Sequence, residues 1–329
     1  MSKNRTFFII LVVILAISQT LYSQEKPKHH TKTEINITPM IEINPVDVTV
    51  PYVVVTDDLR QLYEKSIETT GGKILTASSV AGDIEISTWD KNEVNVKILG
   101  NDEAERKLIF DSYQTDEGVK IDCGQKKEGN LNNLDLKIIV NIPTDYSVDL
   151  FTGGGNITVQ DLKGTIKMTT SGGNINIDRT NGSIAAFTSG GNITTEDNTG
   201  SIELSTSGGM ITATNYTGDI NASTLGGHIT LKGSEGYIKA STSGGNIKID
   251  YTGKNDGIDA STLGGNIVAY LPSDFSADAD IGTLAGRVDC DFAKVDNEKI
   301  STFLKTKFNN GGKTFKCITS GGNIVINKK

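Results

Sequence analysis

The chain has 329 residues, with 32 basic and 40 acidic side chains and a net charge of −8. Nucleic-acid binding requires Lys and Arg side chains that neutralise phosphates, so an acidic chain without basic runs is a poor candidate for it. The same charge disfavours binding to an anionic membrane surface. The 3 cysteines are too few for a disulfide framework and lack the spacing of a zinc site.

The N-terminus has the pattern of a signal peptide. Lys3 and Arg5 precede an apolar run over 7–17, and small residues suitable for cleavage follow at Ser18 and Ser23. A membrane-spanning helix needs about 20 apolar residues, and this run is much shorter. We therefore expect residues 1–23 to be removed on export. The mature protein would be periplasmic, on the cell surface or extracellular, without insertion into a membrane.

The segment over 24–63 contains Pro and is rich in Val. It is expected to form a leader or an N-terminal cap, because an open solenoid end is an edge that invites aggregation. Apolar spacing also predicts two short helices, over 58–65 and 102–108.

Glycines set a regular period along the chain. Gly-Gly pairs begin at residues 154, 172, 190, 208, 226, 244 and 264, so consecutive pairs are 18 residues apart and the last two are 20 apart. An Ile stands two positions after each pair, and single glycines fall half a period away, at 164, 182, 200, 218 and 236. Each period therefore holds two short segments and two corners.

The segments between the corners alternate between apolar and polar residues. Residues 202–206, for example, read Ile-Glu-Leu-Ser-Thr, and a period of two predicts a strand with one buried face. One rung of two strands cannot bury its apolar row, whereas stacked rungs bury a continuous core. The sequence thus predicts an all-β solenoid with rungs of 18 residues. Glycine and asparagine at the corners are expected to take positive φ, which both tolerate.

The solenoid is expected to extend over 64–329. Its regular rungs lie over 152–270, while 64–151 and 271–329 would form less regular flanking rungs of the same kind, with an insertion at about 293–312. Stacking in register places isoleucine above isoleucine on two walls. It also creates a row of threonines whose hydroxyls are expected to bind the corner backbone: Thr170, Thr188, Thr206, Thr224, Thr242 and Thr262.

Several of these features are shared with one known family. They are Gly-Asp-Ile-Glu-Ile at 82–86 with Trp89 just after it, Ile142-Pro143 before the first regular rung, and the Ser-Gly-Gly-Asn-Ile series. In these features the chain resembles the bacterial toastrack family, Gly-rich β-solenoid domains with an adhesin label, over roughly 64–329. The resemblance implies a β-solenoid at the cell envelope or surface. It brings no catalytic residues, since the family has no assigned biochemical activity.

Metal binding is disfavoured by the repeat itself. Calcium-binding β-rolls repeat Gly-Gly-x-Gly-x-Asp, but residues 172–177 read Gly-Gly-Asn-Ile-Asn-Ile, with isoleucine where a hard cation needs oxygen. His228 replaces a corner Asn, as Met210 does at another corner, and it is expected to be a tolerated substitution. We predict no metal, no cofactor and no nucleophilic triad, because no suitable base lies near a candidate nucleophile.

Asp178 and Glu196 are the outward acidic neighbours in the array. They would lie about 5 Å apart on stacked rungs, and a pair of carboxylates is what glycoside-cleaving enzymes use. A carbohydrate-active lyase or glycosidase is therefore the alternative function. We favour a solvated pair without a catalytic role. Lys232 and Lys248 are expected to pair with Asp250 across rungs.

Outward serines form a second regular feature, with Thr169 and Phe187 extending their column: Ser205, Ser223, Ser241 and Ser261. A hydroxyl array of this kind suits carbohydrate or ice. Solvation of a β-face is the favoured interpretation, because Phe187 and Tyr237 stand alone and provide no aromatic platform.

The cysteines all fall at inward positions, so Cys123, Cys290 and Cys317 are expected to be buried, inert thiols. A Cys290–Cys317 disulfide is the alternative in an exported protein. Taken together, the sequence predicts a non-catalytic binding or scaffold module at a bacterial cell envelope, with an envelope glycan or a surface protein as its partner.

Overall fold

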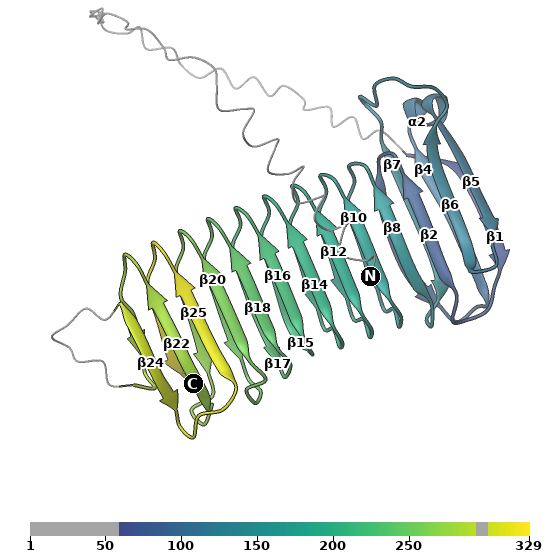
Figure 1. The fold of residues 1–329 in the computed structure, drawn as a ribbon. Coiled ribbons are helices and arrows are strands. Elements are labelled where there is room, and N and C mark those ends of the chain that lie inside the picture. Colours follow the sequence, from purple (N-terminus) through teal and green to yellow (C-terminus); the bar gives the residue numbers. More distant parts are fainter. Residues whose placement is uncertain (1–58, 294–301) are drawn as a thin grey trace, which may run out of the picture. The chain divides into compact units, whose positions relative to one another are not determined.

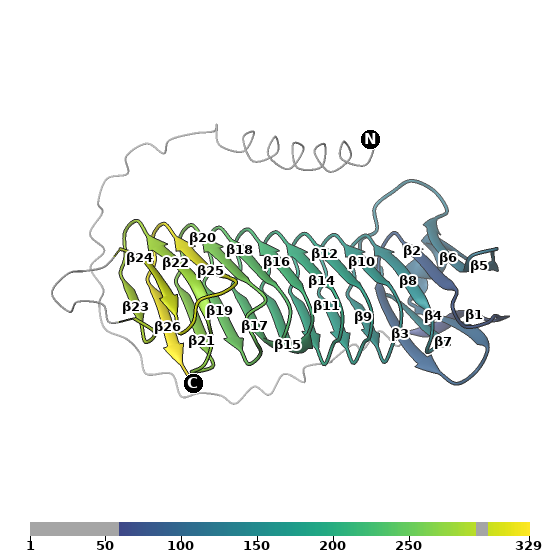
Figure 2. The same cartoon turned by 60° about the horizontal axis from the view of Figure 1, so that its bottom comes forward.

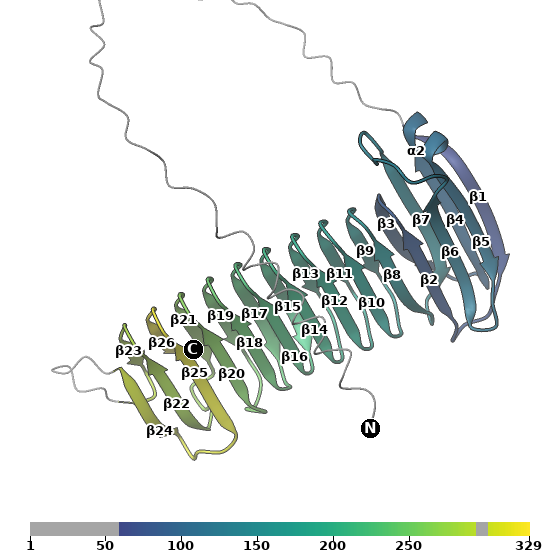
Figure 3. The same ribbon diagram turned by 45° about the horizontal axis from the view of Figure 1, so that its top comes forward.

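The alternating segments form strands that stack into two parallel walls. The computed structural model describes residues 59–293 and 302–329, and the predictions for 1–23 and for 24–58 lie outside them. The strands form two 13-stranded sheets, here called sheet A and sheet B. Figure 1 shows the rungs side by side along one axis, and Figures 2 and 3 show the sheets as the two walls of the stack. The predicted β-solenoid is confirmed.

Each regular rung contributes one strand to each sheet. In sheet A these are β9 (Ile157–Gln160), β11 (Ile175–Asp178), β13 (Ile193–Glu196), β15 (Ile211–Thr217), β17 (Ile229–Ser234), β19 (Ile247–Tyr251) and β21 (Ile267–Leu271). In sheet B they are β8 (Ser147–Thr152), β10 (Ile166–Thr170), β12 (Ile184–Thr188), β14 (Ile202–Thr206), β16 (Ile220–Thr224), β18 (Ile238–Thr242) and β20 (Ile258–Thr262). Neighbouring strands pair in parallel and in register, so that Ile166, Ile184 and Ile202 stack directly.

The core is the space between the two sheets. Ile184 and Ile202 of sheet B and Ile193 and Ile211 of sheet A are at most 1% exposed. Because every second residue points inward, the alternate residues are left on two flat outer faces. Any binding surface on these rungs must therefore be built from outward columns or from the corners.

The threonine row binds the corner backbone, as predicted. Thr206 Oγ1 donates to the carbonyl oxygen of Gly191 at 2.8 Å and accepts from the N–H of Gly209 at 3.2 Å. The same pair of hydrogen bonds recurs at Thr188 and Thr224. Each hydroxyl thus satisfies one donor and one acceptor that the corner would otherwise bury unpaired.

The glycine pairs are required for a different reason from the one expected. Positive φ occurs at the single glycines, for example Gly182 (φ 146°), and at residues such as Asp161 (φ 60°), but not at the Gly-Gly pairs of the regular rungs. At Gly209 a Cβ would lie 1.9 Å from the carbonyl oxygen of Gly191 in the previous rung. The second glycine of a pair is therefore needed because the backbones of successive rungs touch there. The expected positive φ at the Gly-Gly corner was wrong.

The N-terminal end departs from a simple stack. Its elements are β1 (Arg60–Glu68), β2 (Ile74–Ser79), β3 (Asp83–Trp89), β4 (Glu93–Gly100), α2 (Asp102–Lys107), β5 (Leu108–Gln114), β6 (Gly118–Gln125) and β7 (Leu136–Pro143). The rung of β2 and β3 lies between the rung of β8 and β9 and the rung of β6 and β7, out of chain order. Three antiparallel strands, β1, β4 and β5, then close the end. Residues 93–114 are thus not part of a degenerate rung.

One predicted helix at this end is confirmed and one is wrong. α2 begins after Asn101, whose side chain accepts a hydrogen bond from the Ala104 N–H at 3.0 Å, a standard N-cap. A helix was predicted over 58–65, but residues 60–68 form strand β1, which pairs with β4. Pairing with a neighbouring strand has overridden a weak local helix signal. Among the described residues, no helix is long and apolar enough to span a membrane.

The C-terminal end also contains a rung out of chain order. Its strands are β22 (Ala277–Thr283), β23 (Val288–Cys290), β24 (Phe303–Phe308), β25 (Thr314–Thr319) and β26 (Ile324–Lys328). The last rung, β25 and β26, lies between the rung of β20 and β21 and the rung of β22 and β23. β24 pairs antiparallel with β22 as the edge of sheet B. The chain end is thereby held between two earlier rungs.

Candidate functional site

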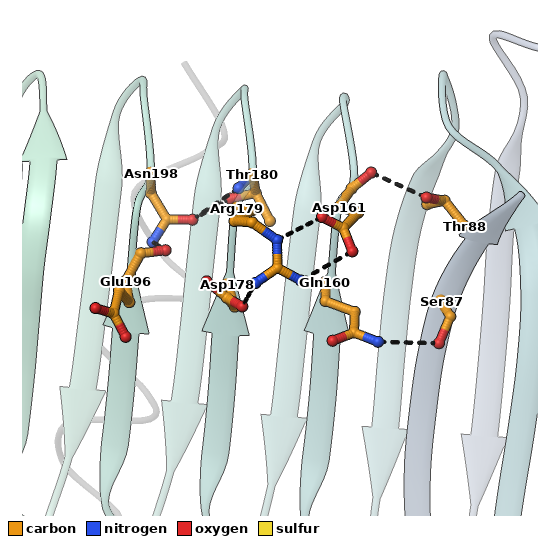
Figure 4. A network of polar contacts seen from close by, with 9 residues as sticks. All are labelled: Ser87, Thr88, Gln160, Asp161, Asp178, Arg179, Thr180, Glu196 and Asn198. Atoms are coloured by element: carbon orange, nitrogen blue, oxygen red, sulfur yellow. Dashed lines mark hydrogen bonds and ion pairs between the residues drawn. The ribbon is translucent and has the colours of Figure 1, made fainter.

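The predicted acidic pair lies on the outer face of sheet A, where Figure 4 shows its neighbours. Asp178 and Glu196 are register partners on β11 and β13. The next residue, Arg179, forms a bidentate contact with Asp161, with Nε 2.6 Å from Oδ1 and Nη2 2.9 Å from Oδ2. Arg179 also pairs with the carboxylate of Asp178. One guanidinium therefore holds two carboxylates from successive rungs.

The corner geometry brings these groups together. Asp161, Arg179 and Asp197 are equivalent residues of successive rungs, and all have positive φ, at 60°, 50° and 55°. Hydrogen bonding to Arg179 lowers the pKa of the Asp161 carboxyl, and the Asp161 hydrogen bond raises the pKa of Arg179. Both side chains are about half exposed, so water screens the pair and its contribution to stability is small.

This arrangement does not suit acid–base catalysis by Asp178 and Glu196. A glycosidase pair needs one carboxyl that stays protonated, which burial or a neighbouring anion provides. Here the carboxylate of Asp178 is paired with Arg179, and the Glu196 side chain is exposed to water. Sequence reasoning missed Arg179 and Asp161, although their spacing of one period, with opposite charges, was a usable signal.

A buried polar cluster lies beneath the same corner. Asn198 is 1% exposed and its Oδ1 accepts from the Thr180 N–H at 3.1 Å. Its Nδ2 donates to the carbonyl oxygen of Glu196 at 2.8 Å. Figure 4 shows Asn198 spanning the two rungs. Because its polar atoms are all occupied by the protein, Asn198 fastens the corner and offers nothing to a ligand.

His228 belongs to a ladder of side-chain acceptors along the Gly-Gly corner. In this ladder Asn174 Oδ1 accepts from the Asn192 N–H of the next rung at 2.8 Å. His228 keeps the pattern, since its Nδ1 accepts from the Asn246 N–H at 2.8 Å. Met210 has no such oxygen or nitrogen, so the ladder is interrupted at its position. The prediction that His228 replaces a corner Asn holds, and the structure adds its role as an acceptor.

Asp250 has a different partner from the expected lysines. Its carboxylate pairs with Lys329 near the chain end, while Lys248 lies over the Tyr270 ring at 5.6 Å from the centroid. Lys232 is the register neighbour of Asp250, but it forms no ion pair among the described residues. Lys329, at the end of the inserted C-terminal rung, is therefore the ion-pair partner of Asp250 in place of Lys232.

The serine column exists and has an aromatic extension that sequence analysis missed. Ser205, Ser223 and Ser241 are aligned on β14, β16 and β18 of sheet B. In the same column, Phe151 of β8 lies two rungs from Phe187 of β12. Phe151 is 43% exposed. Phe187 is thus not isolated, because the column continues before the first regular Gly-Gly corner.

The cysteines are buried free thiols, as predicted. Burial raises the pKa of Cys123 to about 12, and it also raises the pKa of Cys317 and Cys290. The alternative Cys290–Cys317 disulfide is not formed in this structure. These thiols are protonated at neutral pH and closed to reagents.

A cleft lies at each end of the stack. A basic one of about 440 Å³ is lined by Arg106, Lys107, Lys126 and Lys127 among others. Two of these amines are occupied, since Lys107 pairs with Glu103 at 2.8 Å and Lys126 donates to the Glu105 carbonyl at 2.7 Å. The other, of about 550 Å³, lies over β22 and β24. Within the described part of the chain, no group of His, Cys, Asp and Glu side chains is placed to hold a metal ion.

The family is decided by a match over most of the solenoid. The Toastrack DUF4097 family model matches residues 73–327. The chain belongs to this toastrack family. The span of the match includes both rungs that are out of chain order, so these rungs are part of the toastrack domain and not an addition to it.

Solved structures match this chain at low identity and with low TM-scores. A "putative adhesin" from Bacteroides fragilis is 15% identical, with 81% of this chain and 96% of that chain covered and a TM-score of 0.40. A "putative cell adhesion protein" from Clostridium sporogenes is 15% identical, covering 82% and 100%, with a TM-score of 0.28. A "putative lipid binding protein" from Parabacteroides distasonis is 16% identical, covering 81% and 96%, with a TM-score of 0.33. A comparison with curated proteins finds no match.

Proposed function

We propose that this toastrack protein is an exported, non-catalytic binding or scaffold module at the bacterial cell envelope. The observation that carries the proposal is the pairing of polar side chains on the outer faces of the solenoid. On several rungs they pair with one another from rung to rung, as Arg179 does with Asp161 and Lys167 with Asp149. Long flat faces with such paired groups present a broad surface, which suits adhesion or scaffolding better than turnover.

Export is supported by the sequence of residues 1–23, with its basic start and short apolar run. The partner is expected to be an envelope glycan or a surface protein. Nucleic acid is disfavoured by the net charge of −8. The adhesion proteins among the solved structures are consistent with this proposal.

Two measurements test the proposal. The full chain and a variant lacking residues 1–23 are expressed in a bacterial host, and cell fractions are probed for each. We expect the full chain in the periplasm or at the surface and the variant in the cytoplasm. The exported protein is then incubated with purified envelope fractions, which should retain it.

Turnover provides the counter-test. The exported protein is incubated with soluble polysaccharides, and released reducing ends and unsaturated products are measured. We expect none above a blank. Release that disappears in an Asp178→Ala, Glu196→Ala double variant would establish the carbohydrate-active enzyme instead, and it would overturn the non-catalytic proposal.

A further inference from the structure

The outer face of sheet B carries two aromatic rings at a fixed spacing along the solenoid axis. Phe151 on β8, Thr169 on β10 and Phe187 on β12 are register partners on three successive rungs. These strands lie side by side in Figure 1. Rungs are about 4.8 Å apart, so the rings are about 9.6 Å apart with only the Thr169 side chain between them.

The rings are placed at the surface and not in the core. Phe151 is 43% exposed, and Phe187 is partly exposed beside the small Ala185. A large apolar side chain in water loses the stabilisation that burial would give, about 1.5–3 kcal/mol. The neighbouring core positions on these strands, Leu150 and Ala186, are fully buried, so the phenylalanines do not complete the core.

Polar groups flank the rings in the adjoining outward column. Asp149, Lys167, Ala185 and Glu203 are register partners in that column. Lys167 Nζ lies 2.9 Å from Asp149 Oδ2, so these two charges neutralise each other. Hydroxyl-bearing Ser205 and Ser223 continue the ring column over the next rungs. The strip thus offers flat apolar platforms bordered by hydrogen-bonding groups and small hydroxyls.

We propose that this strip, defined by Phe151, Thr169, Phe187, Asp149, Lys167 and Glu203, binds an extended, uncharged β-linked glycan chain that runs along the solenoid axis. The C–H faces of a β-linked sugar ring pack on aromatic rings, while its equatorial hydroxyls reach sideways to polar groups. Each sugar of an extended β-linked chain advances by nearly one rung spacing. Phe151 and Phe187 therefore contact alternate sugars, and Thr169 leaves room for the sugar between them.

Charge selects the kind of glycan. The ring column from Phe151 to Ser261 contains no charged residue among its paired positions, and the chain as a whole carries a net charge of −8. A polyanionic glycan would be repelled by this excess, whereas a neutral one is not. This inference rests on the proposed binding function and names its ligand class and its surface.

The test is calorimetric titration of the full chain with three soluble probes at up to millimolar concentration. They are chitohexaose, which is β-linked and neutral, its trimer chitotriose, and maltohexaose, which is α-linked. We expect the hexamer to bind at least 10-fold more tightly than the trimer, because the trimer reaches only the two rings, whereas the hexamer also reaches the serine hydroxyls beyond them. Maltohexaose should not bind, since its helical shape cannot follow a straight strip.

Variants then locate the site. Phe151→Ala and Phe187→Ala should each weaken chitohexaose binding about 10-fold, and the double variant should abolish it. Leu284→Ala is the matched control, because Leu284 is an exposed apolar side chain, at 83%, that lies at the Ala285-Gly286 corner away from the strip. Melting curves check that every variant is folded; the exposure of Phe151 predicts little change.

Failure of this inference can be told from failure of the proposed function. Absence of chitohexaose binding, equal binding of maltohexaose, or unchanged binding by the double variant would each overturn the glycan strip. If envelope fractions still retain the exported double variant, the binding module stands and its contact surface lies elsewhere. If the full chain is not exported or turns over a polymer, the proposed function itself fails.

Discussion

The second glycine of each pair should be the least replaceable residue of the solenoid. At Gly191 an added Cβ would lie 1.9 Å from the carbonyl oxygen of Gly173 and 2.8 Å from the Asn174 nitrogen. Both are backbone atoms, so no side chain can move aside. Moving that Cβ to about 3.0 Å requires the two rungs to separate by roughly 1.1 Å, against a strand spacing of about 4.8 Å.

That separation breaks the hydrogen bonds around the corner. The Ile175 N–H donates to the carbonyl oxygen of Asn192 at 2.9 Å, and the Asn192 N–H donates to Asn174 Oδ1 at 2.8 Å. The Thr188 hydroxyl donates to the carbonyl oxygen of Gly173 at 2.9 Å. Lengthened by about 1.1 Å they no longer meet hydrogen-bond geometry. At roughly 1 kcal/mol each, their loss gives a destabilisation of about 3 kcal/mol for Gly191→Ala.

The neighbouring Gly190 is the matched control. A Cβ there would meet nothing closer than 3.8 Å, and its φ is not in the left-handed region. Gly190→Ala should leave stability unchanged or raise it by about 0.4–1 kcal/mol, because alanine restricts the unfolded chain. Urea unfolding followed by far-UV circular dichroism measures both variants. If the two midpoints agree within error, backbone contact is not what selects the second glycine.

Three further predictions concern single groups. Met210→Asn should raise stability by about 1 kcal/mol in urea unfolding, since its amide oxygen would complete the acceptor ladder toward the His228 N–H; an equal or lower midpoint would contradict the ladder. Tyr216→Phe should be neutral or stabilising by about 1 kcal/mol, because the buried Tyr216 hydroxyl has no partner among the described residues. Tyr251→Phe should instead destabilise the protein, because the Tyr251 hydroxyl donates to the Lys254 carbonyl at 2.5 Å. Burial raises the pKa of Cys123 from 9.0 to about 12, so the folded state holds this proton more tightly and stability should fall between pH 9 and 12; the fall should be shallower in Cys123→Ala, and equal slopes would contradict it.

The regular rungs were readable from the sequence because one residue type occupies each place in the period. Ile184, Ile202 and Ile220 are spaced by one period and stack, and the threonine hydroxyls bind the corner as expected. Local chemistry and stacking agree at every such position, which is the condition for a sequence to specify its fold. The role of the Gly-Gly pair was misassigned because the contact that requires it lies between rungs and not within one.

The candidate surfaces were harder to predict, for a related reason. Asp161 and Arg179 meet only because each stands at the equivalent left-handed corner of its rung, and strand alternation does not reveal that corner. Phe151 lies before the first regular Gly-Gly pair, so its place in the column of Phe187 follows from the pairing of β8 with β10. Phe151 nevertheless stands one period of 18 residues before Thr169, so the column is found by counting the period back past the first Gly-Gly pair.

The order of rungs at the two ends is the part that no periodicity can supply. The corner at Thr283 to Val288 carries the same pattern as the corner at Thr262 to Ile267, and the final corner repeats it, so pattern alone permits either as the next neighbour of β20. Outward charge distinguishes them. Asp259 on β20 faces Lys316 of β25 at 3.8 Å, whereas β22 would place Asp280 beside it. Like charges on adjacent strands are unfavourable, and the inserted lysine lies between two aspartates instead. Cross-strand charge thus favours the order that holds the chain end inside the stack.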